Sequence, residues 1–103
     1  MLGRSDDTVI TGGENVQPEE VEAVLRAPGV LDAAVAGRPD ADLGEIPVAW
    51  LVGEVSIPAI EAWCRDRLAP FKVPRAWHRV ATLPRTESGK LPRKRLPATG
   101  QAS

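Results

Sequence analysis

The chain has 103 residues, 43% of them hydrophobic, which is enough to bury one modest core, so we expect one domain. A single cysteine excludes an intrachain disulfide and a cysteine-based metal cluster, and no apolar run is long enough to span a bilayer. The net charge of −1 hides an asymmetry, because residues 1–45 carry ten acidic and three basic side chains and residues 46–103 carry four acidic and ten basic. The basic second half suits an anionic ligand, a phosphate-bearing small molecule or nucleic acid, while the acidic first half argues against wrapping a duplex. The alternative is a solvated surface of scattered charges.

The first third of the chain predicts a strand, a loop and a helix. Residues 8–10 are β-prone, and residues 11–15 interrupt them with two adjacent glycines, which tolerate a positive φ. Pro18 suits a first helical turn, and apolar side chains follow it at helical spacing: Val21, Val24 and Leu25. Pro28 and Gly29 then end the predicted helix.

Two apolar segments in the middle of the chain predict a hairpin-like pair of strands. Residues 30–37 are short and apolar enough for a strand buried on both faces, with a helical turn as the alternative. Residues 39–45 have the composition of a surface loop, and residues 46–52 predict a second strand. We expect Pro47 at the edge or the first residue of that strand, because proline cannot donate to the ladder.

The next segment predicts a second helix, a crossing and a last strand. Ser56 can cap a helix that has Pro58 in its first turn and an apolar face running to about Leu68. Two prolines make residues 69–75 an extended crossing, and residues 77–81 alternate as a strand.

The tail from Leu83 is expected to be mostly loop, with a short basic turn near residues 91–96. The element order β-α-β-β-α-β predicts an α+β fold, with helices packed on a small mixed or antiparallel sheet. A ferredoxin-like arrangement shares this order.

Several single residues have structural interpretations. Cys64 lies on an apolar helical pattern and is expected to be a small core residue rather than a nucleophile. The only histidine, His78, is expected to pack or lie at the surface, and the tryptophans are expected to anchor the core or an interface: Trp50, Trp63 and Trp77. Residues 93–95 form a basic cluster that fits a solvated turn or a contact with nucleic acid.

One motif ends in a lysine: Pro-Arg-Thr-Glu-Ser-Gly-Lys at residues 84–90. It differs from a phosphate-binding P-loop, because Pro84 stands where that loop needs glycine and Leu91 where it needs serine or threonine. An ammonium on a long stem can nevertheless approach a carboxylate and a phosphate oxygen together, and it would neutralise charge on a pentavalent phosphorus. Lys90 is therefore a candidate catalytic residue.

A second motif occupies residues 3–22, with Gly-Arg-Ser-Asp-Asp at its start, Gly12-Gly13 in its middle and Pro-Glu-Glu-Val-Glu at its end. Together with the lysine motif and the Phe-Lys-Val-Pro crossing at residues 71–74, it resembles the adenylate-forming superfamily of acyl-CoA synthetases, aryl-CoA ligases, luciferases and peptide-synthetase adenylation domains. The resemblance covers residues 3–96. It implies that residues 1–97 are the mobile C-terminal lid domain of such an enzyme, with residues 98–103 as a disordered tail.

The resemblance also implies roles for residues of the adenylation step. Asp6 matches the hinge about which the lid rotates, and Arg4 matches the arginine that contacts the nucleotide ribose. Lys90 matches the lysine that bridges the acyl carboxylate and the nucleotide while the acyl-adenylate forms. A hinge is physically reasonable, because the thiol must approach the same carbonyl after Lys90 withdraws.

For the second step, the resemblance implies that the loop at Gly12 and Gly13 lines the pantetheine tunnel of CoA, and that Lys72 or Arg75 meets the CoA nucleotide phosphates. The sequence after the hinge is more similar to that of CoA ligases than to that of peptide-synthetase domains, so CoA is the expected acceptor. Lys90 also resembles a site that a lysine acetyltransferase neutralises to switch such ligases off.

The expected function is therefore that of a lid in an ATP-dependent acyl- or aryl-CoA ligase, inactive as the isolated chain. ATP, CoA and magnesium would be bound mainly by a large N-terminal domain, which this sequence lacks and which would act in cis or in trans. We expect a cytoplasmic location, no metal site, no nucleic-acid or membrane partner, and no tightly bound cofactor. The alternatives are a non-catalytic binding module that retains the lid fold and a small nucleic-acid-binding domain.

Overall fold

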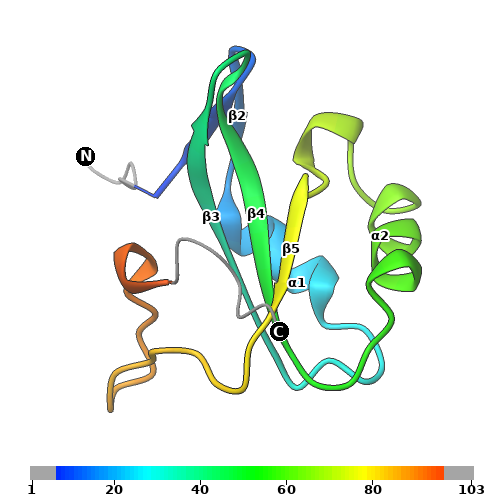
Figure 1. Cartoon of the computed structure of the whole chain (residues 1–103), viewed down its shortest axis with the longest axis vertical. Coiled ribbons are helices and arrows are strands. Elements are labelled where there is room, and N and C mark those ends of the chain that lie inside the picture. Colours follow the sequence, from blue (N-terminus) through cyan, green and yellow to red (C-terminus); the bar gives the residue numbers. More distant parts are fainter. Residues whose placement is uncertain (1–6, 97–103) are drawn as a thin grey trace.

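The computed structural model describes residues 7–96, except for the side chain of Lys94. The elements, in chain order, are β1 (Val9–Thr11), β2 (Glu14–Val16), α1 (Pro18–Leu25), β3 (Asp32–Asp40), β4 (Gly44–Val52), α2 (Ile57–Arg65), the 3-10 turn η1 (Pro70–Lys72), β5 (Ala76–Arg79) and the 3-10 turn η2 (Arg93–Arg95). The predicted α+β class is confirmed (Figure 1).

The sheet is mixed and has β4 at its centre. Its antiparallel part follows the order β2-β1-β4-β3, and β5 pairs with β4 in parallel. The β3–β4 hairpin confirms the predicted pair of strands, although β3 extends to Asp40 and leaves a shorter loop than expected. β1 pairs with the beginning of β4 and β5 with its second half, so the two share one side of the central strand.

Both faces of the sheet are covered, which explains the continuous apolar runs of its two long strands. Side chains alternate along a strand, so Ala33 and Val35 of β3 face one core while Ala34 and Ala36 face the other. The first core lies against α1 and α2 and includes the buried Cys64, as predicted. The second core is covered by the segment that follows β5, through side chains including those of Leu83, Leu91 and Leu96.

The single aromatic and sulfur-bearing residues have packing roles. Trp50 is fully buried in the second core, with Trp63 and Trp77 at the margin of the first. The ring centroid of His78 lies 5.5 Å from that of Trp50, and burial followed by the charge of Arg38 lowers the histidine pKa. Burial raises the pKa of the Cys64 thiol to about 11, so this cysteine is a packing residue at neutral pH.

Three expectations differ from the structure. Residues 11–15 are not a simple loop, because β1 and β2 form a hairpin in which Thr11 pairs with Glu14. The crossing at residues 69–75 contains η1 rather than being fully extended, and α2 ends at Arg65, short of Leu68. Short elements of this kind carry too few residues for a periodic pattern.

Pro47 lies inside β4, paired with Gly37, rather than at the edge or start of the strand. The carbonyl of Pro47 accepts a bond from the Arg75 amide at 2.8 Å, on the side of β4 away from β3. Since the nitrogen and carbonyl of one strand residue point to the same side, the missing donor faces the gap between β1 and β5 and costs the β3 ladder nothing.

The predicted helix cap at Ser56 is confirmed. The Ser56 hydroxyl accepts a bond from the Ala59 amide at 3.3 Å, and both helices have proline in their first turn. Within residues 7–96, neither helix has the length and apolar character needed to cross a bilayer.

Candidate functional site

The loop that carries Lys90 is closed by bonds between its two ends. The Thr86 amide donates to the Lys90 carbonyl and the Gly89 amide to the Thr86 carbonyl, each at 2.9 Å. The Thr86 hydroxyl accepts from the Lys90 amide at 3.1 Å. Gly89 has a φ of 90°, which a residue with a side chain rarely adopts, so glycine before the lysine permits this closure.

Lys90 itself is exposed, and among residues 7–96 its ammonium has no ion-pair or hydrogen-bond partner. Its backbone is fixed while its charge is unused within the domain. Such an arrangement is suited to a ligand or a surface outside the described chain.

Arg85 attaches this loop to the sheet. Its Nε and Nη2 donate to the two carboxylate oxygens of Asp32 at 2.8 and 2.7 Å. The hydrogen bond from Arg85 holds the pKa of Asp32 below its usual range, and the same bond raises the pKa of Arg85. Both groups are therefore charged at neutral pH.

A second arginine, Arg93, attaches the end of the same segment. Its Nη2 lies 2.7 Å from Oε2 of Glu22, Nη1 lies 3.1 Å from Oδ2 of Asp7, and Nε donates to the Val35 carbonyl at 2.8 Å. The side chains of Arg93 and Glu22 are each only 10% exposed. This is a buried ion pair in which every guanidinium nitrogen and both oxygens of Glu22 take part in hydrogen bonds, the kind of pair whose disruption is costly.

Both arginines contact the open edge of β3, where backbone groups would otherwise lack partners. The Val35 amide donates to Glu22 at 2.8 Å and the Ala33 amide to Asp32 at 2.9 Å, while the carbonyls of the same two residues accept from Arg93 and Arg85. The segment from residue 83 to 96 thus follows the sheet edge and leads into and out of the Lys90 loop.

The turn at Gly12 and Gly13 joins β1 to β2. Both glycines have a positive φ, 57° and 86°, which is the geometry of a tight type I′ hairpin turn. The Gly12 amide donates to the Leu43 carbonyl at 2.9 Å, so the turn rests on the β3–β4 turn. No side chain covers the turn at Gly13, where an added Cβ would meet nothing within 4 Å.

The turn and the lysine loop lie at opposite ends of the molecule (Figure 1). The lysine loop is bonded to Asp32, the first residue of β3, and the turn rests on Leu43, beyond its last residue. A strand of nine residues spans about 26 Å. The two candidate regions therefore cannot contact one small group at the same time.

Lys72 and Arg75, the two basic candidates near the crossing, differ in their surroundings. The Lys72 ammonium pairs with both carboxylate oxygens of Glu20, at 3.0 and 2.9 Å. The Arg75 side chain is exposed and has no charged partner in the described part of the chain. η1, which ends at Lys72, packs against β2, so this region lies at the same end as the glycine turn.

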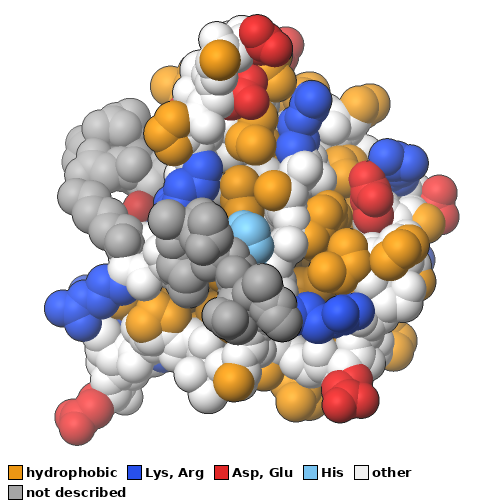
Figure 2. Space-filling view, viewed as in Figure 1, with side chains coloured by type: hydrophobic (Ala, Val, Ile, Leu, Met, Phe, Trp, Pro, Cys, Tyr) orange, Lys and Arg blue, Asp and Glu red, His pale blue; other side chains and the backbone are white. Residues whose placement is uncertain are grey.

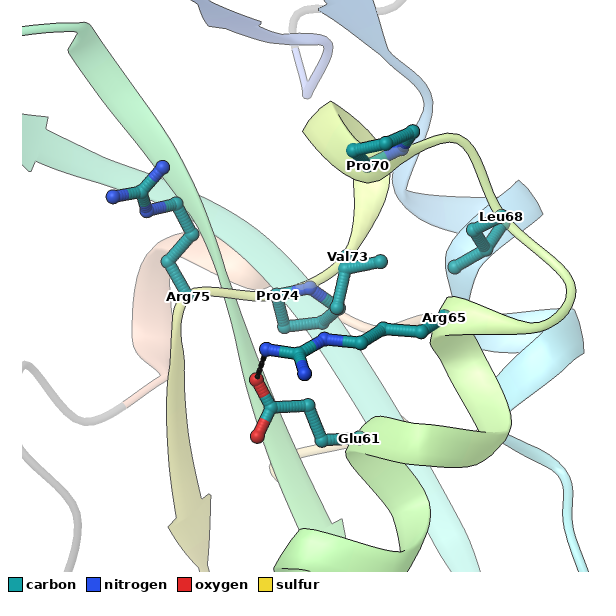
Figure 3. A pocket seen from close by; sticks show the side chains of 7 residues that line it. All are labelled: Glu61, Arg65, Leu68, Pro70, Val73, Pro74 and Arg75. Carbon is teal, nitrogen blue, oxygen red and sulfur yellow. Dashed lines mark hydrogen bonds and ion pairs between the residues drawn. The ribbon is translucent and has the colours of Figure 1, made fainter.

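Arg75 borders a pocket of about 530 Å³ between α2 and η1 (Figure 3). Glu61 and Arg65 form an ion pair of 2.8 Å across one side of it, and the side chains of Val73 and Pro74 contribute apolar surface. The guanidinium of Arg75 points away from this pair. Considering only the described residues, the pocket has at its rim a cation, Arg75, that no acidic side chain neutralises.

The other predictions concern the hinge region, the tail, a metal site and nucleic acid. Arg4 and Asp6 lie outside the described residues, as does the predicted tail at residues 98–103. The described residues contain no group of three histidine, cysteine or acidic side chains arranged to hold a metal ion. On the face in Figure 2, lysine and arginine side chains stand apart among hydrophobic and acidic ones, which does not favour a nucleic-acid surface.

Sequence reasoning did not identify Arg85, Asp32, Arg93 or Glu22. Arg85 and Asp32 are 53 residues apart in the chain, and Arg93 and Glu22 are 71 apart. Each pair forms only when the last segment reaches the edge of β3. The charge difference between the acidic first half and the basic second half indicates that ion pairs can form between them. It does not indicate which residues pair.

Comparisons with known proteins agree with the family resemblance of the sequence motifs. The family model for the AMP-binding enzyme C-terminal domain matches residues 20–90. The 2-succinylbenzoate–CoA ligase of Bacillus velezensis is 48% identical over 99 residues, which cover 93% of this chain and 20% of the ligase.

Two solved structures of o-succinylbenzoate CoA synthetase from Bacillus subtilis are similar at 40% identity. The complex with the acyl-adenylate intermediate OSB-AMP has a TM-score of 0.87 and covers 93% of this chain and 20% of that one. A double mutant bound with the product analogue OSB-NCoA has a TM-score of 0.86 and covers 95% and 21%. The chain spans about a fifth of the length of the relatives it matches.

Proposed function

The chain belongs to the AMP-binding enzyme C-terminal domain family, and from this we propose that it acts as the lid of an ATP-dependent acyl- or aryl-CoA ligase. In the first half-reaction a carboxylate oxygen attacks the α-phosphorus of ATP and pyrophosphate leaves. In the second, the thiol of CoA attacks the acyl carbonyl and AMP leaves. A large domain in cis or in trans would hold the acyl group, ATP and magnesium.

The observation that carries the proposal is the exposed ammonium of Lys90, which has no partner within residues 7–96 and lies on a closed and anchored loop. In the first half-reaction this charge would neutralise the developing negative charge on phosphorus and orient the acyl carboxylate. Its fixed backbone limits the motion that must be lost when the lid closes on the substrates.

The position of the glycine turn supports a separate role in the second half-reaction. A bare backbone at Gly13 leaves room for a narrow chain such as pantetheine, and the turn lies at the end of the molecule opposite the lysine loop. A rotation about Asp6 would exchange the two ends at the reaction centre, with Arg4 contacting the ribose. Arg75 is better suited than Lys72 to the CoA phosphates, because Glu20 already neutralises Lys72.

A fusion tests this proposal. We would join the large domain of the Bacillus subtilis synthetase to this chain, supply ATP, magnesium, 2-succinylbenzoate and CoA, and follow pyrophosphate and thioester. Lys90→Ala should lower pyrophosphate formation by about a hundredfold to a thousandfold, the usual effect of removing one group that stabilises transition-state charge.

The matched control is Glu87→Gln, an exposed change in the same loop, which should leave both products unchanged. Adenylation that survives Lys90→Ala at the wild-type rate would contradict the lid function and favour the non-catalytic binding module. A cytoplasmic location remains a prediction.

Acetylation of Lys90 is a further part of the proposal. The exposed ammonium is accessible to an acetyltransferase, and an acetyl group would remove the charge that the first half-reaction needs. Mass spectrometry of the protein from cells checks this, and a Lys90 that is always unmodified would rule it out.

A further inference from the structure

The Arg85 guanidinium donates four hydrogen bonds, three to residues of β3 and one within the lysine loop. Besides the paired bonds to Asp32, its Nη1 donates to the Gly89 carbonyl at 3.3 Å and its Nη2 to the Ala33 carbonyl at 3.4 Å. Gly89 directly precedes Lys90. One guanidinium therefore connects the start of the loop, its end and the sheet.

The sheet side of this connection is rigid. Asp32 pairs with Val52 in the long β3–β4 ladder, and Ala33 is buried in the first core. Within the loop, by contrast, closure depends on three bonds that involve the backbone of Thr86, Gly89 and Lys90, all of which are exposed. Arg85 is the side chain whose hydrogen bonds hold the loop in a fixed position relative to the β3–β4 ladder.

The exposure of the pair distinguishes positioning from general stabilisation. The side chains of Arg85 and Asp32 are 32% and 33% exposed, and ion pairs at such sites contribute little to global stability. Their two-pronged geometry is nevertheless specific, because lysine supplies the same charge without the planar fork.

We propose that Arg85 is a positioning residue for Lys90, whose fork on Asp32 and bond to Gly89 fix where the lysine is delivered during adenylation. This inference rests on the proposed function and adds to it a residue that does not touch the substrates. A loose loop would still bring the charge near the phosphate, but without fixed geometry.

The first test uses the whole chain alone. Arg85→Lys should speed hydrogen exchange of the Thr86, Gly89 and Lys90 amides by about tenfold, while the β3–β4 amides and the midpoint of thermal unfolding stay unchanged. Arg67→Lys is the matched control, because Arg67 is also an exposed arginine that donates to a carbonyl, that of Trp63, at 3.0 Å. Unchanged exchange in the loop would overturn the inference without any activity assay.

The second test uses the fusion and separates the half-reactions. Arg85→Lys and Asp32→Asn should each lower kcat of adenylation by about tenfold to a hundredfold with little change in KM for ATP, the range expected for a small misplacement. The double variant should be no worse than either single one, because both remove the same contact. Thioester formation from supplied acyl-adenylate should be unchanged.

An equal loss in both half-reactions would show a merely structural role and overturn the inference. Lys90→Ala separates the two hypotheses. If Lys90→Ala abolishes adenylation while the Arg85 and Asp32 variants keep the wild-type rate, only the positioning role is wrong. If Lys90→Ala has no effect, the proposed function is wrong as well.

Discussion

The glycine turn and the lysine loop lie at the two ends of β3, and they are held by different kinds of interaction. Gly12 and Gly13 rely on the backbone, with a positive φ at each residue and strand pairing on either side. The lysine loop relies on side chains, since Arg85 and Arg93 attach its flanks to β3. A region fixed by backbone geometry and one fixed by distant side chains should respond differently to mutation.

The difference between the two regions follows from the role proposed for each. A bare turn offers space, which requires that no side chain project from it. A catalytic ammonium needs a long side chain in one place, and this requires support from outside the loop. The two designs therefore make separate predictions about stability.

The largest effect is expected at Arg93. Arg93→Ala would leave the carboxylate of Glu22, 10% exposed, without its cation, and it should lower the free energy of unfolding by about 3–5 kcal/mol. Chemical denaturation measures this loss. Arg93→Lys, which keeps a cation beside Glu22, should cost less than Arg93→Ala, and equal losses for the two variants would contradict the buried-pair account.

A smaller effect is expected at the glycine turn. Gly13→Ala meets no atom within 4 Å but forces a side chain into a φ of 86°, so it should cost about 1–2 kcal/mol through backbone strain alone. Gly13→Asn should cost less, because asparagine tolerates this region. Equal unfolding free energies for the two variants would argue that the strain is not the cause.

The smallest effect concerns pH and the Arg85–Asp32 pair. Because the hydrogen bond from Arg85 lowers the pKa of Asp32 below its ordinary 3.8, the pair stabilises the fold above pH 3.8 and loses that contribution as pH falls through the lowered value. The stability difference between wild type and Asp32→Asn should be constant from pH 5 to 8 and shrink below about pH 3.8. A difference that shrinks near pH 6 would contradict this assignment.

The sequence predicted the parts of the fold that depend on periodicity and on local chemistry. The helix at Pro18, the cap at Ser56, the doubly buried strand and the core position of Cys64 each have a signal within a few residues. The type I′ hairpin was missed although its two glycines were noticed, because the strands that flank them have three residues each. Pro47 was misplaced because only tertiary pairing creates the gap that accommodates it.

The candidate site divides in the same way. Motifs made Lys90 and the two glycines candidate residues, and these roles stay predictions. The anchors Arg85 and Arg93 could not be assigned in this way, since their partners lie on β3 and α1, far away in sequence. Glu20 likewise pairs with Lys72 across 52 residues, and this pairing makes Arg75 the better candidate for a phosphate. Long-range ion pairs need the topology before they can be assigned.

The central claim is that the lysine loop and the glycine turn serve separate half-reactions. The most direct test is to measure both half-reactions for Lys90→Ala and Gly13→Ala in the same fusion, with acyl-adenylate supplied for the second. The account predicts that Lys90→Ala slows only adenylation and Gly13→Ala slows only thioester formation. If the two variants slow both half-reactions in the same proportion, the two ends do not serve separate steps and the account is wrong.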